Sequence, residues 1–492
     1  MPRVKSVERR RANHAKSRKG CLTCKGKEPE DQIMQFHLEY LTHFPVTPHS
    51  SPHQLPSHPD DTQTSRRAFE FFCTVTCGQL STRLEGEFWS RFVVPLASQD
   101  STVRSAVSAF AAFHEDFMRG INLTKEVNYD ALQMYNSAII EHVRNSDPSV
   151  HLEPAVAFVP CLIFAIIEML RGNLVAFTQL ISKSFPLILA MNRERGENED
   201  RMSQSPLYVI IIMFRNFVMD ACGASRMLGS EAWLSLDVPN LDQTRRSMPC
   251  VFSSVLEARR FLDALAQAFV SEGCHDEIPL SSDTDIRIGC DEHWKETLAS
   301  WTAAFEGFLA TDETLSKADL QEARILQIRS LHYQISLDVS LREGAYNQMV
   351  WDQYLPQYEV IVNLSEALCE DSNNKDAKPF LSLGRWLVGP LSDIAVRCRD
   401  PGFRRRAVAT LERFPQRDGF MDGRLAIEAA KRCIEIEEGG SEVLCADNVP
   451  ESRRISRVRA IPDSVRQKVS LRYFRYTDGN DPSGLEVEEP LG

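Results

Sequence analysis

From Ser65 to about residue 440, apolar residues recur at helical spacing, and this periodicity constrains the fold more than any other feature of the sequence. The first predicted helix face consists of Phe69, Phe72, Cys73, Thr76 and Leu80. These residues stand at positions i, i+3, i+4, i+7 and i+11, which lie on one side of an α-helix. Alternating strand patterns joined by Asn-Gly or Asp-Gly turns are scarce. We therefore predict an all-α body.

Further helices follow along the chain. Asp100 is placed to cap one that Gly120 ends, because Asp accepts backbone hydrogen bonds at helix starts and Gly tolerates the left-handed conformation at helix ends. Dense apolar segments cover residues 155–191, broken at Pro186, and residues 208–221. Two later helix faces consist of Ile328, Leu331, Ile335 and Val339, ending before Gly344, and of Leu425, Ala429, Cys433 and Ile436.

The longest apolar run, Ala155 to Leu170, contains Pro160 and Glu168. It is too short and too interrupted to span a bilayer, which needs about 20 apolar residues. The run predicts a buried helix, and we expect no membrane partner. The 13 cysteines are scattered, without the paired spacing of a disulfide framework, which favours a soluble protein in a reducing compartment.

Charge is divided unevenly between the first 27 residues and the remainder. Ten Lys or Arg lie in the first 27 residues against one acid, Glu8. The remaining 465 residues hold 46 basic and 67 acidic groups. On electrostatic grounds, only the basic arm would approach nucleic acid.

Two clusters of cations within this arm have the spacing of a nuclear-import signal. The candidate residues are Arg9, Arg10, Arg11, Lys16, Arg18, Lys19 and Lys25. The same residues could contact phosphate groups of DNA. Two alternatives remain open: an import signal that never touches DNA, and a solvated terminus without either role.

Composition divides the chain into four parts. Residues 1–30 form the basic arm, with too little apolar content in 1–20 to fold alone. Residues 31–64 form a Pro/His-rich linker, residues 65–440 the helical body, and residues 441–492 a C-terminal tail. In the tail, Tyr473, Phe474 and Tyr476 could dock onto the body, and a partly ordered tail is the alternative.

Cys21 and Cys24 form a Cys-x-x-Cys inside the basic arm. This spacing allows two thiolates to bind one metal ion, but a structural zinc site needs four ligands. The next cysteine is Cys73, and the histidines that follow have no zinc-finger spacing. We therefore expect that this chain does not hold Zn²⁺ stably.

Other metal-capable residues suggest no site. Cys73 and Cys77 lie among phenylalanines and are expected to be ordinary buried cysteines. Cys274-His275 and Cys290 with His293 have no convergent partners in the sequence and receive no role. The sequence also contains no nucleophile elbow, zinc-protease motif or phosphate-binding glycine loop, so we do not predict an enzyme.

The segment Ser17 to Lys25 resembles the opening of the fungal Zn2Cys6 (C6 zinc cluster) transcription factors. The body resembles the regulatory domain found behind such clusters. The motifs that carry this resemblance are Phe69-Glu70-Phe71-Phe72, Cys77-Gly78-Gln79-Leu80-Ser81, Glu87-Phe88-Trp89, Val103-Arg104, residues 111–117, residues 131–136, Leu170-Arg171-Gly172-Asn173 and Cys398-Arg399-Asp400-Pro401. These motifs are mostly helix-packing residues and span roughly residues 65–440.

The resemblance implies an α-helical regulatory body, a location in the nucleus and control of RNA polymerase II genes. It further implies DNA, the transcription machinery or family paralogues, and a second copy in a homodimer as partners. Cys21 and Cys24 match the family's first two zinc ligands, but ligands three to six are missing, and Asp31 stands where the third would be. Either the coding sequence is truncated or misjoined, or a genuine relative has lost direct DNA reading.

Two function hypotheses follow from these features. The first is a nuclear transcription regulator of the fungal C6 type with an incomplete DNA-binding module, whose DNA contact is weak or indirect. The second is a regulatory or interaction protein derived from that family, which acts as a dimerising modulator without DNA contact.

Overall fold

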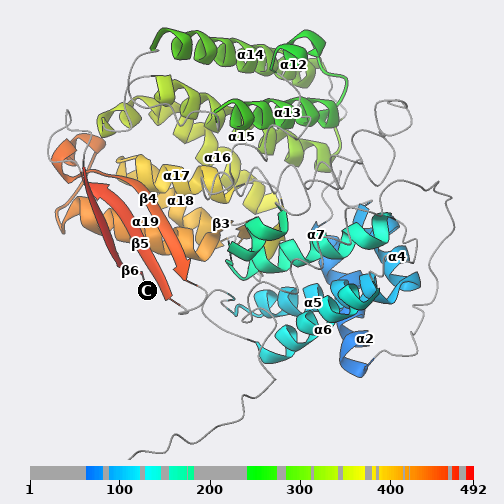
Figure 1. The fold of residues 1–492 in the computed structure, drawn as a ribbon. Helices are drawn as coiled ribbons and strands as arrows, with labels where there is room; N and C mark the ends of the chain where they lie inside the picture. Colours follow the sequence, from blue (N-terminus) through cyan, green and yellow to red (C-terminus); the bar gives the residue numbers. More distant parts are fainter. Residues whose placement is uncertain are drawn as a thin grey trace, which may run out of the picture.

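The computed structural model describes residues 62–80, 88–121, 123, 128–145, 154–173, 175–181, 241–273, 284–311, 315–341, 347–371, 379–383, 387–413, 416–419, 421–463, 468–475 and 484–491. Over these residues the protein is mostly helical, as predicted, and carries two small sheets (Figure 1). The basic arm, most of the linker and the apolar segment 208–221 lie outside the described residues. The four-part division of the chain stays a prediction.

The first group of helices surrounds α5, which contacts most of the others. Its elements are α2 (Gln63–Phe71), η1 (Phe72–Thr76), α3 (Cys77–Leu80), η2 (Phe88–Val93), α4 (Val94–Gln99), α5 (Ser101–Met118), α6 (Tyr129–Asn145) and α7 (Pro154–Leu170). The predicted cap of α5 is confirmed: the Val103 amide donates to Asp100 Oδ1 at 2.9 Å. Gly120 adopts a φ of +82° just after the helix, as predicted.

Helix α7 is buried along its length from Phe158 to Leu170, which confirms the predicted buried helix. It packs on α5 and carries Pro160 inside the helix. Proline has no amide hydrogen, so one backbone hydrogen bond is missing at this point. Among the described residues, no helix is long and apolar enough to cross a membrane.

A second group of helices packs around two tryptophans, Trp294 and Trp301. It comprises α12 (Leu241–Ser247), α13 (Val255–Gly273), α14 (Thr284–Thr311) and α15 (Lys317–Leu341). The indole of Trp301 donates to the Ala258 carbonyl at 2.9 Å and so joins α14 to α13. Helix α15 carries the predicted Ile328 and Ile335 face into the next core and ends before Gly344, as expected.

From residue 347 onward, the described residues form four long helices, several short helical turns and the two sheets. The helices are η3 (Gln348–Tyr354), α16 (Leu355–Asp371), α17 (Val388–Arg397), α18 (Pro401–Arg413), α19 (Gly423–Glu438), η4 (Ala446–Asn448) and η5 (Glu451–Arg453). In the first sheet, β1 (Phe380–Ser382) pairs in parallel with β2 (Gln416–Asp418), which pairs antiparallel with β3 (Met421–Asp422). The predicted face of α19 is confirmed, since Leu425, Ala429 and Cys433 are buried.

The second sheet lies against α19 (Figure 1). Strands β4 (Ile455–Asp463), β5 (Lys468–Arg475) and β6 (Leu485–Pro490) form an antiparallel sheet in the order β4-β5-β6. Val469, Leu471 and Tyr473 point inward and meet α19. Of the three aromatic residues predicted to dock the tail, Tyr473 packs against α19, whereas Phe474 lies on the opposite side of the sheet. We did not expect this docking to occur through strands. Tyr476 lies outside the described residues.

Candidate metal and nucleic-acid residues and the buried polar networks

The residues predicted to bind metal or nucleic acid all precede the described chain. Cys21 and Cys24 belong to residues 1–61, as do Arg9, Arg10, Arg11, Lys16, Arg18, Lys19 and Lys25. The structure therefore does not test these assignments, and their roles stay predictions.

Cys73 and Cys77 are the metal-capable pair that the structure does describe. Cys77 is buried and Cys73 is half-buried, on the side of η1 and α3 that faces the first core. Burial raises the pKa of Cys73 to about 11 and that of Cys77 to about 12, so both are protonated thiols at neutral pH. Within the described parts of the chain, no three His, Cys, Asp or Glu side chains are grouped so that they could hold a metal ion.

His293 lies near the surface of α14 beside α12. Its Nε2 is 3.3 Å from Asp242 Oδ1, and Arg245 Nη1 approaches the same ring nitrogen to 2.9 Å. Cys274 and His275 lie outside the described residues, as does the side chain of Cys290. The structure therefore gives His293 surface polar partners, and it does not place the neighbouring candidates.

The motif Cys398-Arg399-Asp400-Pro401 forms the junction between α17 and α18. Asp400 Oδ1 accepts hydrogen bonds from the amides of Gly402 at 2.9 Å and Phe403 at 3.1 Å, and so caps α18. Pro401 is the first residue of that helix, where a missing amide hydrogen costs nothing. The motif therefore turns the chain sharply and places Arg399 in the protein interior.

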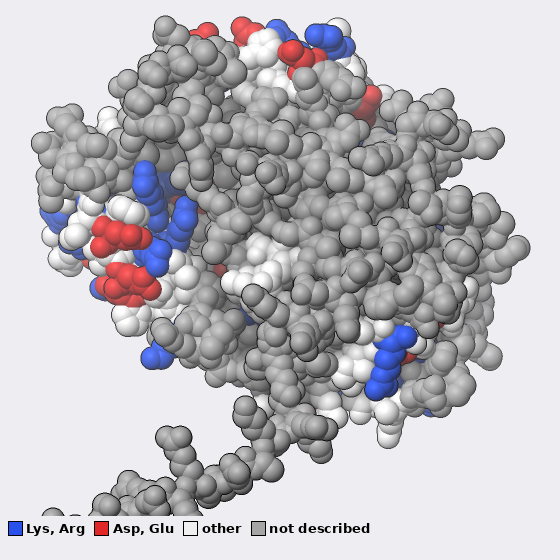
Figure 2. Space-filling model, in the orientation of Figure 1, with Lys and Arg blue, Asp and Glu red and all other residues white. Residues whose placement is uncertain are grey.

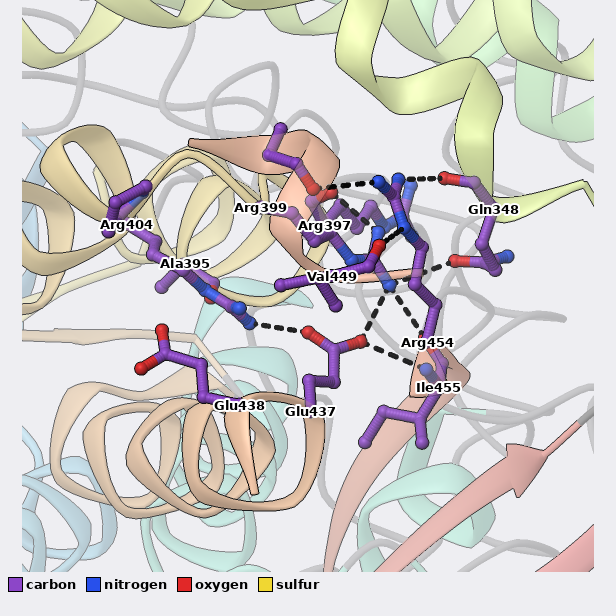
Figure 3. A network of polar contacts seen from close by, with 12 residues as sticks. Gln348, Ala395, Arg397, Arg399, Arg404, Glu437, Glu438, Val449, Arg454 and Ile455 are labelled. Carbon is purple, nitrogen blue, oxygen red and sulfur yellow. Dashed lines mark hydrogen bonds and ion pairs between the residues drawn. The ribbon is translucent and has the colours of Figure 1, made fainter. Parts of the chain in front are cut away.

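Arg399 and Arg404 share one buried carboxylate, that of Glu437 on α19 (Figure 3). Arg399 Nη2 lies 2.8 Å from Oε1, and Arg404 Nη2 lies 2.9 Å from Oε2. The backbone amide of Ile455 also donates to Oε1 at 2.9 Å. Burial alone would raise the pKa of Glu437, but the two guanidinium groups outweigh burial and hold this pKa below its ordinary value.

Arg454 extends this network to the helix η3. Its guanidinium donates to both carboxylate oxygens of Asp352, at 2.9 and 2.7 Å, and its Nε donates to the Val449 carbonyl at 2.8 Å. A two-point Arg–carboxylate contact fixes orientation as well as distance. The network therefore joins η3, α17, α18, α19 and the start of β4.

A second buried carboxylate, Glu168, organises the end of α7. It accepts from Arg171 Nη1 at 2.8 Å and from Asn173 Nδ2 at 2.8 Å. Tyr135 on α6 also bonds to Glu168, and burial together with this carboxylate raises the pKa of Tyr135. Gly172 adopts a φ of +68°, which lets the chain turn directly after α7. The motif residues 171 and 173 thus hold the Glu168 carboxylate, which in turn joins α7 to Tyr135 on α6.

His114 is fully buried on α5 between two polar partners. The Leu381 amide donates to Gln79 Oε1 at 3.0 Å, which identifies this Gln79 atom as the oxygen. His114 Nε2 lies 3.1 Å from the same oxygen and so donates to it, while Nδ1 accepts from the Thr76 hydroxyl at 2.9 Å. Burial lowers the pKa of His114 to about 3. The side chain is therefore neutral in the folded protein.

We expect His114 to make the protein less stable in mild acid. The unfolded chain takes up a proton at this residue near pH 6.5, whereas the folded protein does so only near pH 3. Between these values stability falls with falling pH, by about 1.4 kcal/mol per pH unit, or about 2 kcal/mol from pH 6.5 to pH 5. Urea unfolding at pH 7 and pH 5 should show a clearly smaller loss for His114→Gln than for the unsubstituted protein. Equal losses would contradict this account.

Three side chains tie distant parts of the chain together. Gln79 reaches the Pro379 carbonyl as well as the Leu381 amide. Arg424 on α19 donates to the carbonyls of Gly120 at 2.7 Å and Ile121 at 3.3 Å, at the end of α5. The first core is also completed by two residues from the C-terminal half, Leu381 and Leu383.

Arg417 on β2 is the third and most buried of these ties. It donates to the Met169 carbonyl at 2.7 Å, to Asp422 Oδ2 at 3.1 Å and to the Gly419 carbonyl at 3.2 Å. Asp422 in turn caps α19, since its other oxygen accepts from the Arg424 amide at 2.9 Å. Arg417 thus connects the last turn of α7 with the first turn of α19.

These networks hold helices together and present no reactive group to a substrate. Glu437, Glu168 and His114 are buried, and each is already engaged by protein donors or acceptors. Sequence reasoning missed them as interacting sets because the partners lie far apart in the chain. The resemblance motifs at residues 170–173 and 398–401 were the signal that could have found two of them.

Comparison with known proteins gives one distant relative. The chain is 22% identical over 375 residues to the aspercryptin biosynthesis cluster-specific transcription regulator atnN of Emericella nidulans. The aligned region covers 70% of this chain and 57% of the relative, so the chain matches little more than half of that protein's length. No family model matches the sequence, and no solved structure matches it. The chain is thus distantly similar to a fungal transcription regulator.

Proposed function

We propose that the protein is a nuclear regulator of transcription of the fungal C6 type, which acts on RNA polymerase II genes. The observation that carries this proposal is the similarity to a transcription regulator over 375 residues, most of them in the helical body. The cationic arm supports it, because an import signal and a phosphate-binding segment both require clustered Lys and Arg. The helical body serves as the regulatory part.

The arm does not provide a complete zinc site. Cys21 and Cys24 supply two thiolates, whereas a structural zinc ion takes four ligands and a C6 cluster takes six cysteines. The residues present therefore do not fit the family's metal cluster, and the DNA contact that we propose uses no zinc. It consists of phosphate contacts by the arm and is independent of DNA sequence.

Neutralising part of the arm tests the proposal. The test variant replaces Arg9, Arg10 and Arg11 together with Gln. This variant should accumulate less in the nucleus and bind a DNA duplex of mixed sequence more weakly than the unsubstituted protein. The logarithm of the DNA-binding constant falls linearly with the logarithm of the salt concentration, and each phosphate that the arm neutralises adds about 0.9 to the magnitude of this slope. Removing three cations should therefore reduce the magnitude of the slope by about 3. Fluorescence microscopy and binding titrations at several salt concentrations provide the two measurements.

The matched control is Arg66, Arg260 and Arg413 changed together to Gln. These arginines are exposed on the body, and the control removes the same charge. It should leave both nuclear entry and the salt slope unchanged. Tight, salt-tolerant binding of one DNA site by the unsubstituted protein would overturn the proposed mode of DNA contact.

A second candidate function is a regulator that acts through other proteins without touching DNA. The acidic body favours it, because 67 acidic groups against 46 basic ones repel a polyanion. Promoter occupancy of the arm variant, with nuclear entry restored by an added import signal, separates the two candidates. Retained occupancy supports the protein-mediated mode, and abolished occupancy supports contact through the arm.

A further inference from the structure

The solvent-facing side of the sheet β4-β5-β6 carries an ordered pattern of charge. Side chains alternate along β5, so Ser470, Arg472 and Phe474 face outward while Leu471 and Tyr473 face α19. The register places Glu488 opposite Arg472 and Glu486 opposite Phe474, and these glutamates are exposed on β6. Figure 2 shows basic and acidic side chains next to each other over this sheet.

In one row of cross-strand neighbours, the side-chain charge changes from positive on β4 and β5 to negative on β6. Arg459 on β4 lies opposite Arg472, which lies opposite Glu488. Arg472 is engaged by its acidic neighbours, at 2.9 Å from Glu488 and 3.3 Å from Glu486. Within the described residues, Arg459 forms no ion pair and faces a like charge across the strands, which disfavours this pairing.

Arg457 adds a second cation at the β4 side. The β-bulge between Ser456 and Arg459 gives Arg457 a φ of +50°, a conformation that costs a non-glycine residue free energy. The bulge turns the side chain over the ring of Phe474, with the guanidinium 5.2 Å from the ring centroid. Around Arg457 and Arg459 the β4 side of the face is therefore cationic, and the facing part of β6 is anionic, with Phe474 and Arg472 between them.

We propose that this face binds the same face of a second copy of the chain, about a two-fold axis parallel to β5. Such an axis exchanges the two sides of the sheet, so that β4 of each protomer lies over β6 of the other. Arg459 then faces Glu488 of the partner subunit, and Arg457 faces Glu486 of the partner subunit. A two-fold interface repeats each contact, and two sheets stack naturally with nearly aligned strands.

The charge pattern favours a second copy over a polyanion. A nucleic acid would match Arg457 and Arg459 but would meet Glu486 and Glu488 on the same face. A second copy matches both sides at once, while Arg472 in the middle of the row, which Glu486 and Glu488 of its own sheet already pair, lies opposite Arg472 of the partner subunit. The strand edges are protected against pairing with another strand, since β4 carries the bulge and Pro462 and β6 ends in charged residues and Pro490. Association therefore uses the face of the sheet.

Charge reversal provides the test, in the full chain. Sedimentation velocity at about 0.15 M salt should show a dimer for the unsubstituted protein. Each of the two single variants, Arg459→Glu and Glu488→Arg, should raise the Kd of the dimer about a hundredfold. The reason is that the two-fold axis creates the contact at two places, and each variant puts like charges opposite each other at both. An equimolar mixture of the two variants should form a heterodimer, since both contacts are then between opposite charges.

The double variant Arg459→Glu with Glu488→Arg should restore the homodimer, because it only exchanges the two ends of the row. Circular dichroism of each variant checks that the body stays folded.

A monomeric unsubstituted protein overturns the proposal. So does a dimer that both single variants leave intact, or a failure of the mixture to associate. Loss of DNA binding in Arg459→Glu, with no dimer at any concentration, would assign the face to nucleic acid instead. The sedimentation outcomes do not depend on whether the arm contacts DNA.

Discussion

Glu437→Gln is expected to destabilise the protein by about 3–5 kcal/mol, the usual cost of removing one partner from a buried ion pair. The substitution preserves shape but leaves Arg399 and Arg404 charged and buried without a counter-ion. It also weakens the bond from the Ile455 amide, which holds the start of β4 against α19. Chemical unfolding followed by circular dichroism measures the change in the midpoint and slope of the transition.

Glu435→Gln is the matched control, since Glu435 lies on the same helix and is exposed while it pairs with Arg432. An exposed ion pair contributes at most about 1 kcal/mol, so this variant should unfold almost as the unsubstituted protein does. Similar losses for the two variants would show that burial of the Glu437 network adds nothing to stability.

The lowered pKa of Glu437 gives a second expectation, in acid. A carboxyl with a depressed folded pKa contributes stability that is complete above its unfolded value, near 4.5, and that declines as pH falls through the folded value. The difference between Glu437→Gln and the unsubstituted protein should therefore be largest at neutral pH and shrink below pH 4.5. A difference that grows with acidity would contradict the assignment of Glu437 as an ionised group.

Arg417→Met is expected to destabilise the protein by about 3 kcal/mol, because it removes the closer of the two guanidinium groups that pair with the buried Asp422 and leaves only that of Arg424, at 3.7 Å. It also removes the donor to the Met169 carbonyl at the end of α7. Since Arg417 links the first helical group to the C-terminal half, we expect the two parts to unfold at separate midpoints in this variant. Differential scanning calorimetry would resolve the two transitions.

Arg413→Met provides the control for Arg417, because Arg413 is exposed at the end of α18 and the charge change is the same. It should leave a single transition close to that of the unsubstituted protein. An unchanged single transition in Arg417→Met would rule out the linking role assigned to this arginine.

Local sequence signals were sufficient for many of the helices. Asp100 and Gly120 predicted both ends of α5, because capping depends on a few neighbouring residues. The face of α19 could be predicted from Leu425, Ala429 and Cys433, since burial of one helix side imposes that spacing. Such features depend on residues within a few turns of one another.

The buried networks could not be predicted in the same way. Arg399 and Glu437 are 38 positions apart, and a charged residue in an amphipathic segment is normally exposed. The second sheet was missed for a different reason. Val469, Leu471 and Tyr473 alternate as a strand requires, but the intervening charges and the bulge in β4 concealed the pattern. The Cys-x-x-Cys and the cationic clusters were visible in sequence, and they lie in residues 1–61, outside the described chain.

The contact between Gln79 and the Leu381 amide, 302 positions later, also sets the timing of folding during translation. At about 5–20 residues per second, the ribosome needs roughly 15 s to a minute to reach that partner. Until then the helices that begin the body lack Leu381 and Leu383, which cover part of their apolar surface. The nascent polypeptide therefore emerges with an unfinished interior, and chaperones that shield apolar surfaces have a long interval in which to bind it.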